Sequence, residues 1–347
     1  MMGCEHLLTL QSLDGAEPVA AADPNPTSRE WAEMCVAGIA TYDTVAGLLD
    51  RDDLDVIVVA TPNFTHHDVV RAVMSHDRHS STGLMVEKPL CTNVDDCREV
   101  ISWDEQRPGL TWMGLEYRFM PTIAALLAHL PQAGALHMVS IREHRFPFLP
   151  KVDNWNRFSA NTGGTFVEKC CHFFDVMRQV TQASPTRVLA SGGQSVNHLD
   201  EMYELADGVL RRSDLLDNGY VIVEFDSGAR GLLDLCMFAE GAPVEQEVVV
   251  VGDAGRIDAT VPGMSVRIGL RTGEAREIPA PLPESVRYVG FHHGATFREH
   301  EEFGSCLLGD RQVKVPLHDG LWSVAMGAAA HMSIDQRRPV DIAELVL

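Results

Sequence analysis

The chain has 347 residues, of which 45% are hydrophobic and 22% are charged, a composition typical of a globular protein. Because this length exceeds what one hydrophobic core usually supports, two domains are expected. The formal net charge of −21 argues against nucleic acid or an anionic membrane as a partner, since both would repel such a surface. No apolar run reaches the roughly 18 residues of a membrane helix, and no basic-then-apolar leader is visible, so a cytoplasmic protein is expected.

Eight cysteines are spread along the chain, and none forms a C-x-x-C pair. The sequence therefore predicts neither a disulfide framework nor a zinc knuckle, and a reducing compartment fits. The histidines, cysteines and carboxylates also lack metal-ligand spacing, so no metal is expected.

Apolar or β-branched runs alternate with amphipathic segments through about residue 120, which predicts a parallel sheet with helices on both faces. We assign a dinucleotide-binding domain to residues 1–120 and a second domain to residues 121–347. The expected strands are Val19–Asp23, Ile39–Tyr42, Val56–Thr61, Leu84–Glu87 and Leu110–Leu115. The expected helices are Glu5–Gln11, Ser28–Cys35, Thr44–Leu49, His66–Met74 and Val94–Trp103.

The N-terminus of this domain lacks the first strand and the complete glycine fingerprint of a dinucleotide-binding unit. A dinucleotide-binding unit begins with a strand and the fingerprint G-x-G-x-x-G, with an acidic residue about 20 positions later. Here Gly3 precedes Asp23 by 20 positions, so we interpret Met1, Met2 and Gly3 as the last three fingerprint positions. The first strand and first two glycines would then lie upstream, with the natural start roughly ten residues earlier. The alternative is a chance glycine.

Asp23 follows an expected strand, where a carboxylate accepts hydrogen bonds from the 2′-hydroxyl of NAD and repels the 2′-phosphate of NADP. NAD is therefore the expected cofactor. The nearby Arg29 keeps NADP possible, and Asp23 can also be read as a simple turn residue before Pro24.

The stretch Gly163–Asp175 combines two glycines with several reactive side chains. A helix is expected to start near Thr165 or Phe166, which places Glu168 and His172 one turn apart, with Asp175 three residues further on. A carboxylate one turn from an imidazole can orient the ring and raise its basicity, as a general base requires. The alternative is an ordinary Glu–His pair on a helix surface.

The second half is rich in alternating strands separated by turns. Strands are expected at Leu136–Phe146, Arg187–Ser191, Tyr220–Phe225, Ala229–Met237, Glu247–Val251, Arg256–Thr260 and Ser265–Leu270. The expected fold is an α+β domain with a large, mostly antiparallel open sheet, and helix 320–333 is expected to return to the first domain.

In the loop 151–161, Trp155 and Arg157 suit sugar or polyol recognition, or only pack the domain junction. His292 and His293 are further loop candidates.

Four motifs follow one another along the chain. They are Thr61-Pro62-Asn63 with His66, then Glu87-Lys88-Pro89, then Glu116-Tyr117-Arg118-Phe119, and then the stretch Gly163–Asp175 with its two glycines and His172. In this order the chain resembles the glucose–fructose oxidoreductase / inositol dehydrogenase / rhizopine-catabolism (Gfo/Idh/MocA) family over essentially its whole length. The resemblance implies a Rossmann-type domain and an NAD(P)-dependent dehydrogenase.

The resemblance also implies residue roles. Lys88 and His172 would stand beside the nicotinamide and the reacting hydroxyl, with Glu168 orienting His172. The cofactor would meet Gly3, Asp23, Thr61, Asn63, His66, Glu87 and Lys88, although His66 can also be a packing residue. The substrate would meet Arg118, Trp155, Arg157, His172 and Asp175.

Two positions depart from the family pattern. Glu168 stands where relatives have Asp, followed by an unusual Lys169, and Glu116 stands where they often have Asn. These changes bear on the substrate more than on the reaction type.

The expected reaction is oxidation of a secondary hydroxyl of a sugar, inositol, other polyol or sugar acid. Two alternatives stay open: a non-catalytic NAD(P)-binding sensor or regulator on the same fold, and an NAD-dependent glycoside-cleaving enzyme. By analogy with relatives, the open sheet face implies a homo-oligomer, either a dimer or a tetramer.

Overall fold

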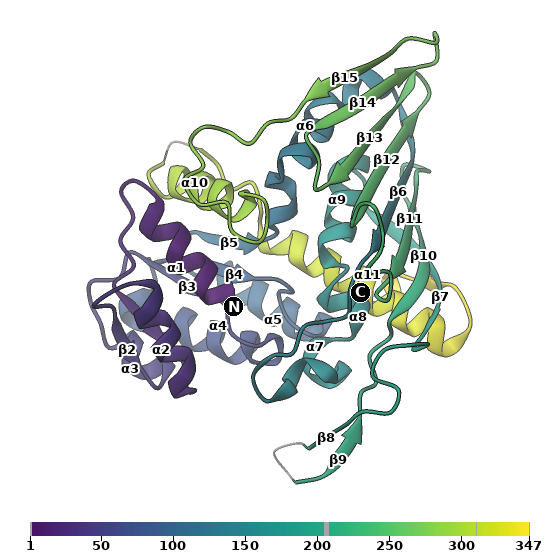
Figure 1. The fold of residues 1–347 in the computed structure, drawn as a ribbon. Coiled ribbons are helices and arrows are strands. Elements are labelled where there is room, and N and C mark those ends of the chain that lie inside the picture. The colour runs from purple at the N-terminus through teal and green to yellow at the C-terminus, as the bar shows by residue number, and fades with distance from the viewer. Residues whose placement is uncertain (1, 205–207, 310, 347) are drawn as a thin grey trace.

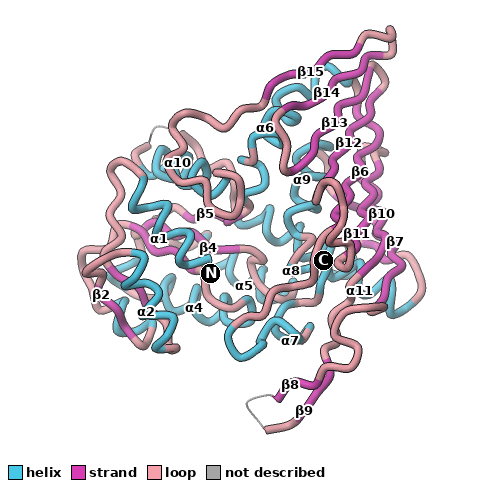
Figure 2. The backbone as a smooth tube through the Cα atoms, viewed as in Figure 1, coloured by secondary structure: helices cyan, strands magenta, loops and turns pink. Residues whose placement is uncertain are grey.

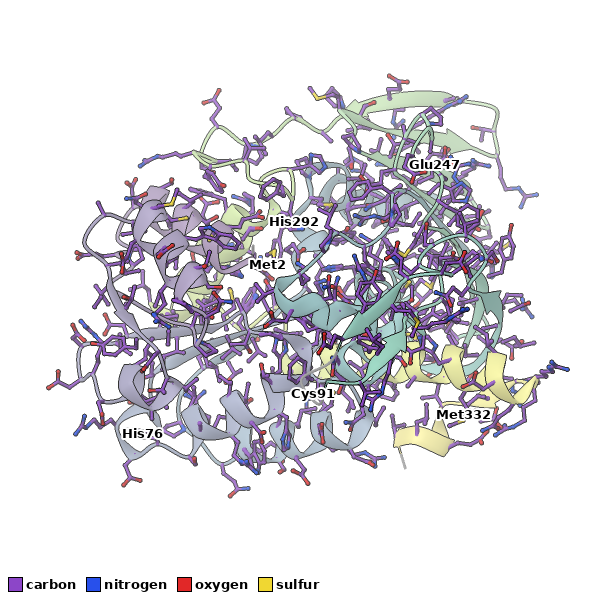
Figure 3. The ribbon with its side chains drawn as sticks, turned by 60° about the horizontal axis from the view of Figure 1, so that its bottom comes forward. Met2, His76, Cys91, Glu247, His292 and Met332 are labelled. Carbon is purple, nitrogen blue, oxygen red and sulfur yellow. The ribbon has the colours of Figure 1, made fainter. Side chains whose placement is uncertain are left out.

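The computed structural model describes residues 2–204, 208–309 and 311–346, so Met1 of the predicted fingerprint lies outside the described residues. Figure 1 shows two domains, a layered helix–strand domain at the N-terminus and a broad twisted sheet with helices on one face. His76 in the first domain and Glu247 on the large sheet lie at opposite sides of the molecule in Figure 3.

The first domain contains short parallel strands covered by helices. Its strands are β1 (Ala20–Ala22), β2 (Ala40–Tyr42), β3 (Val56–Val59), β4 (Gly83–Glu87) and β5 (Thr111–Gly114). Its helices are α1 (Met2–Ser12), α2 (Pro26–Cys35), α3 (Val45–Leu49), α4 (His66–Met74) and α5 (Val94–Asp104). Each strand and helix predicted for this half is confirmed, with ends shifted by a few residues. Strand β4 is buried along its whole length, as a strand covered on both faces should be.

The parallel sheet of this domain is divided. Strand β1 pairs only with β2, and β3, β4 and β5 form a separate sheet in that order. Within the described ranges no strand joins the two parts by hydrogen bonds.

The second domain is built on a nine-stranded sheet in the order β15-β14-β13-β12-β6-β11-β10-β7-β16. Its pairs are antiparallel except for β6 with β11. The fold class predicted from the sequence is confirmed. The strands are β6 (Leu136–His144), β7 (Pro185–Gly193), β10 (Asn218–Phe225), β11 (Arg230–Cys236), β12 (Gln246–Gly252), β13 (Gly255–Val261), β14 (Ser265–Leu270), β15 (Ala275–Pro279) and β16 (Val340–Asp341). A separate hairpin of β8 (Met202–Glu204) and β9 (Leu210–Arg212) projects from the body in Figure 2.

Helices cover one face of this sheet and connect it to the first domain. They are α6 (Pro121–His129), α7 (Ser159–Thr162), α8 (Thr165–Glu168), α9 (Cys171–Thr181), α10 (Ala295–Leu307), α11 (Leu317–Gln336) and α12 (Ala343–Val346). Helix α11 contacts β7 and α9 on one side and α5 and β5 on the other, so it packs against both domains. Helix α10 packs against α1. Among the described residues, no helix is both long and apolar enough to cross a membrane.

Some helices and strands of the second domain differ from the sequence-based expectation. The helix predicted to run from Thr165 through Asp175 is interrupted at Lys169 and Cys170, which separates α8 from α9. At this interruption the Lys169 ammonium pairs with Glu143 of β6 at 2.9 Å. The sequence also did not predict α6, α7, α10, α12, β8, β9, β15 or β16.

Candidate active site

Lys88 follows directly after β4, at the carboxyl end of that strand. Its Nζ donates a hydrogen bond of 3.4 Å to the backbone carbonyl of Glu168. Burial alone would lower the pKa of the Lys88 ammonium, but the neighbouring Cys171, Glu116 and Glu87 raise it above its ordinary value. Lys88 therefore stays a cation at neutral pH.

His172 lies in the first turn of α9 and is buried. Its ring stacks on Tyr117, with centroids 4.0 Å apart and an interplanar angle of 7°. Its Nδ1 has no hydrogen-bond partner. Burial, helped by the charge of Lys88, holds the pKa of His172 well below its usual range. The ring is therefore neutral near pH 7 and keeps a nitrogen available to accept a proton.

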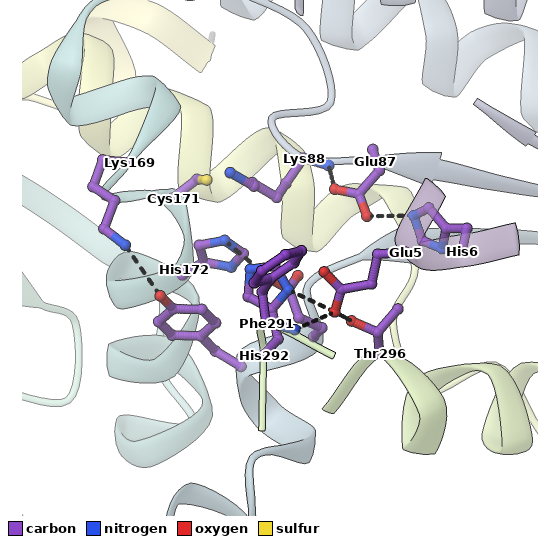
Figure 4. A network of polar contacts seen from close by, with 12 residues as sticks. Glu5, His6, Glu87, Lys88, Lys169, Cys171, His172, Phe291, His292 and Thr296 are labelled. Atoms are coloured by element: carbon purple, nitrogen blue, oxygen red, sulfur yellow. Dashed lines mark hydrogen bonds and ion pairs between the residues drawn. The ribbon is translucent and has the colours of Figure 1, made fainter. Parts of the chain in front are cut away.

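A polar cluster behind Tyr117 holds that stacking ring in place. The Tyr117 hydroxyl accepts hydrogen bonds from Lys169 Nζ at 3.1 Å and from Gln246 Nε2 at 3.0 Å. Lys169 is in turn ion-paired with Glu143. Figure 4 shows Lys169 on the side of the site away from Lys88. Lys169 thus positions Tyr117, which positions His172.

The carboxylate beside His172 is Glu116, not Glu168. Glu116 Oε1 lies 3.5 Å from His172 Nε2, and its side chain is buried. Neither of its oxygens has a hydrogen-bond partner, and burial raises the pKa of this carboxyl group. Glu168 makes no ion pair with His172 within the part of the chain that the structure describes. The break after α8 separates the two residues that the sequence placed on one continuous helix.

Glu168 instead faces a group of cations. Burial raises its pKa to about 7, against the opposing charges of Lys88, Lys151 and Arg157. Its Oε2 is buried without a hydrogen-bond partner. This carboxyl group can therefore accept or donate a hydrogen bond to a molecule in the site.

His292 reaches the site from the loop before α10. Its Nε2 lies 3.6 Å from Glu116 Oε1, and its Nδ1 lies 3.1 Å from Glu5 Oε1. Glu5, in α1, also accepts hydrogen bonds from the Phe291 amide and the Thr296 hydroxyl (Figure 4). Helix α1 thus fixes the His292 loop against the site.

Several residues predicted to hold the cofactor lie along one edge of the first domain. Gly3 is in the first turn of α1, and a Cβ there would meet no atom within 4 Å. Asn63 is buried with its Nδ2 unpartnered, which leaves a donor for a bound molecule. Asp23 follows β1 and accepts a hydrogen bond from the Asn25 amide. The open space and the free donor fit a dinucleotide along this edge.

Other predicted cofactor residues have partners within the protein. His66 Nδ1 lies 2.8 Å from the Pro89 carbonyl oxygen and Nε2 lies 3.0 Å from that of Thr61, so His66 ties two loops together. The Thr61 hydroxyl receives a hydrogen bond from Thr65. Glu87 bonds to His6 Nε2 at 2.8 Å and accepts from the Lys88 amide, which anchors α1 to the end of β4.

The predicted substrate residues Arg118 and Asp175 are paired with each other. Arg118 Nε donates to Asp175 at 2.6 Å, Nη2 contacts Asp175 and Asp319, and Nη1 donates to the Lys314 carbonyl oxygen. Both partners are buried. The structure thus gives these two residues protein partners in place of the expected substrate.

Trp155 and Arg157, in the loop before α7, have different surroundings from each other. Trp155 packs edge-on against Phe64, with centroids 6.1 Å apart, and so lies over the loop after β3. Arg157 is buried, donates from Nε to the Tyr203 hydroxyl at 3.3 Å, and has an unpartnered Nη1. Arg157 therefore retains a free donor near Glu168.

Comparisons with known proteins identify the family of this chain. A family model for the NAD-binding Rossmann fold of the Gfo/Idh/MocA oxidoreductases matches residues 1–115, and the model for the C-terminal alpha/beta domain of the same family matches residues 132–342. The chain belongs to the Gfo/Idh/MocA oxidoreductase family. Its first domain is the NAD-binding Rossmann fold of that family.

Three relatives illustrate how far the similarity extends. The chain is 23% identical to myo-inositol 2-dehydrogenase of Thermotoga maritima, covering 99% of this chain and 97% of that protein. With the rhizopine catabolism protein MocA of Rhizobium meliloti it shares 28% identity over 53% of this chain and 56% of that protein. The solved structure of levoglucosan dehydrogenase in complex with NADH is 16% identical, with a TM-score of 0.82 over 99% of this chain and 96% of that one, which supports the shared fold.

Sequence reasoning missed the roles of Glu5 and Glu116 and left His292 as one loop candidate among several. Glu116 had a signal, since it replaces a residue that is often Asn in the family. Glu5 and His292 are 287 positions apart, so no local pattern could bring them together. Among the described residues, no group of three His, Cys, Asp or Glu side chains could hold a metal ion.

Proposed function

We propose that this protein is an NAD-dependent dehydrogenase that oxidises a secondary hydroxyl of a sugar, a polyol such as inositol, or a sugar acid. The observation that carries the proposal is a half-buried ammonium, Lys88, whose charge acts on a neutral, buried His172 with an unpartnered Nδ1. A hydroxyl that loses a hydride must also lose its proton, so it needs a base and a cation beside one oxygen.

His172 and Lys88 have separate roles in the proposed reaction. His172 accepts the hydroxyl proton at Nδ1, while Tyr117 holds the ring in its plane. Lys88 stabilises the alkoxide that develops, because its raised pKa keeps it charged. Bound NAD supplies the hydride acceptor. The unpartnered donor of Asn63 and the open space at Gly3 support a cofactor site on the first domain, which also carries Lys88 at the end of β4.

The polar side chains around this pair favour a substrate with several hydroxyl groups. Glu168 and Arg157 each present a buried polar atom without a partner. Hydroxyl groups both donate and accept hydrogen bonds, so one polyol can satisfy acceptors and a donor together. An apolar alcohol would leave them unpaired, at a cost of about 1–3 kcal/mol for each group.

A substrate panel tests the proposal. Inositols, aldoses, uronic acids and simple secondary alcohols are incubated with NAD or NADP, and NADH or NADPH formation is followed by absorbance. We expect turnover with at least one polyhydroxylated compound, none with the simple alcohols, and preference for NAD from Asp23 at the end of β1. Absence of turnover over the whole panel would contradict the proposal.

We also propose that two copies associate through the open face of the large sheet. Exposed apolar side chains gather there on neighbouring strands: Met138, Tyr220, Ile222 and Leu232. Such a patch is unusual on a monomer surface. Light scattering should give a mass above the 38.1 kDa of one chain, and Tyr220→Asp with Ile222→Asp should return it to 38.1 kDa. The matched control is Met264→Asp, because Met264 is exposed outside this group of side chains. This variant should keep the mass of the wild-type protein. A monomeric wild-type protein would contradict this proposal.

A further inference from the structure

The proton that His172 accepts has no direct exit. The His172 side chain is 3% exposed, and the Tyr117 ring covers one face of it. Its Nε2 faces Glu116, whose side chain is 1% exposed. A base enclosed in this way must pass its proton to another group before the next turnover.

Two side chains, Glu116 and His292, connect His172 to the protein surface. Glu116 Oε1 lies between two imidazoles, 3.5 Å from His172 Nε2 and 3.6 Å from His292 Nε2. The His292 side chain is 24% exposed, so it meets both the buried carboxyl group and solvent. These separations are slightly longer than hydrogen bonds, and catalytic hydrogen bonds commonly tighten only when substrate is bound.

From this arrangement we infer that Glu116 and His292 form a relay that carries the hydroxyl proton from His172 to solvent. The inference rests on the proposed dehydrogenase function. It gives a role to a carboxyl group with two unpartnered buried oxygens and to a loop histidine contributed from beyond the large sheet.

The steps balance as one proton for each hydride. The substrate hydroxyl gives its proton to His172 Nδ1 as its carbon gives a hydride to NAD. The proton on His172 Nε2 moves to Glu116 Oε1, and Glu116 passes it to His292 Nε2. The His292 imidazolium then releases one proton to solvent. Tautomer exchange after product release restores His172 with no net change in protons.

The surroundings of each group suit this transfer. Burial raises the pKa of Glu116 above its ordinary value, so the carboxyl group can hold a proton for a short time. Burial would lower the pKa of His292, but Glu116 and Glu5 together raise it, which makes the ring a good acceptor. Glu5 also holds His292 Nδ1, so Nε2 points toward Glu116. Glu5 is a positioning residue.

The test compares His292→Gln and Glu116→Gln with the wild-type enzyme, using a substrate identified in the panel. Glutamine keeps polar contacts but cannot carry the proton. The matched control is His293→Asn, since His293 adjoins His292 and has φ 55°, a conformation that Asn tolerates. Turnover is measured in weak buffer and with increasing imidazole, and the first turnover is followed by stopped flow.

We expect His292→Gln to lose at least tenfold in steady-state turnover in weak buffer while still forming about one NADH per site in a first burst. Imidazole should restore its turnover, since a small base can replace the missing ring, and should not affect the wild type or His293→Asn. Glu116→Gln should be impaired without rescue. A His292→Gln enzyme within twofold of wild type, or one that imidazole does not restore, would overturn the relay alone. A wild-type enzyme that forms no NADH would overturn the proposed function as well.

Discussion

Replacing His172 with Asn is expected to lower turnover by roughly two to four orders of magnitude, the usual contribution of a positioned general base. The asparagine amide can fill part of the space beside Tyr117 but cannot accept the hydroxyl proton. NADH binding, measured by fluorescence, should stay close to that of the wild type, because His172 lies in α9 of the second domain. A matched control is His67→Asn, on the surface of α4.

Lys88→Met should produce a loss of similar size by removing the cation beside the same oxygen. Losses of similar size in the His172→Asn and Lys88→Met variants would indicate that the two residues act in one catalytic site. If either variant turned over at the wild-type rate, the assignment of proton transfer to His172 and alkoxide stabilisation to Lys88 would fail.

Arg118→Met is expected to destabilise the protein by about 3–5 kcal/mol, the usual cost of removing one partner from a buried ion pair. The variant would leave Asp175 and Asp319 without their guanidinium. Asp175 is fully buried, so water cannot replace the lost contacts. The measurement is the midpoint of urea unfolding.

The control for this variant is Arg187→Met. Arg187 pairs with Asp341 on the surface, where both side chains are about half exposed, and such pairs contribute at most about 1 kcal/mol. If Arg118→Met were as stable as the wild type but bound substrate poorly, the role predicted from the sequence for Arg118 would be right and the structural role wrong.

The fold could be predicted largely from local patterns. Strands such as Val56–Val59 and Gly83–Glu87 are short apolar runs, and the helices between them carry amphipathic spacing. The interruption between α8 and α9 could not be predicted, because no glycine or proline marks it. Lys169, at the interruption, contacts Glu143 and Tyr117, and those residues lie on other elements.

The candidate site could be predicted only in part. Lys88 and His172 stand in motifs whose order identifies the family, so the sequence pointed to both. The carboxylate near His172 was misplaced, since helical spacing favoured Glu168 and the structure brings Glu116 there. The link from Glu116 through His292 to Glu5 joins three distant segments, and only the packing of α10 on α1 creates it.

The most direct test of the central claim, hydride transfer at the Lys88–His172 site, uses a panel substrate deuterated at the carbon that is oxidised. We expect the deuterium to appear on the nicotinamide ring of the NADH formed, detected by NMR, and the His172→Asn enzyme to form this product far more slowly. Deuterium that appeared in solvent, or transfer at an unchanged rate without His172, would contradict the account.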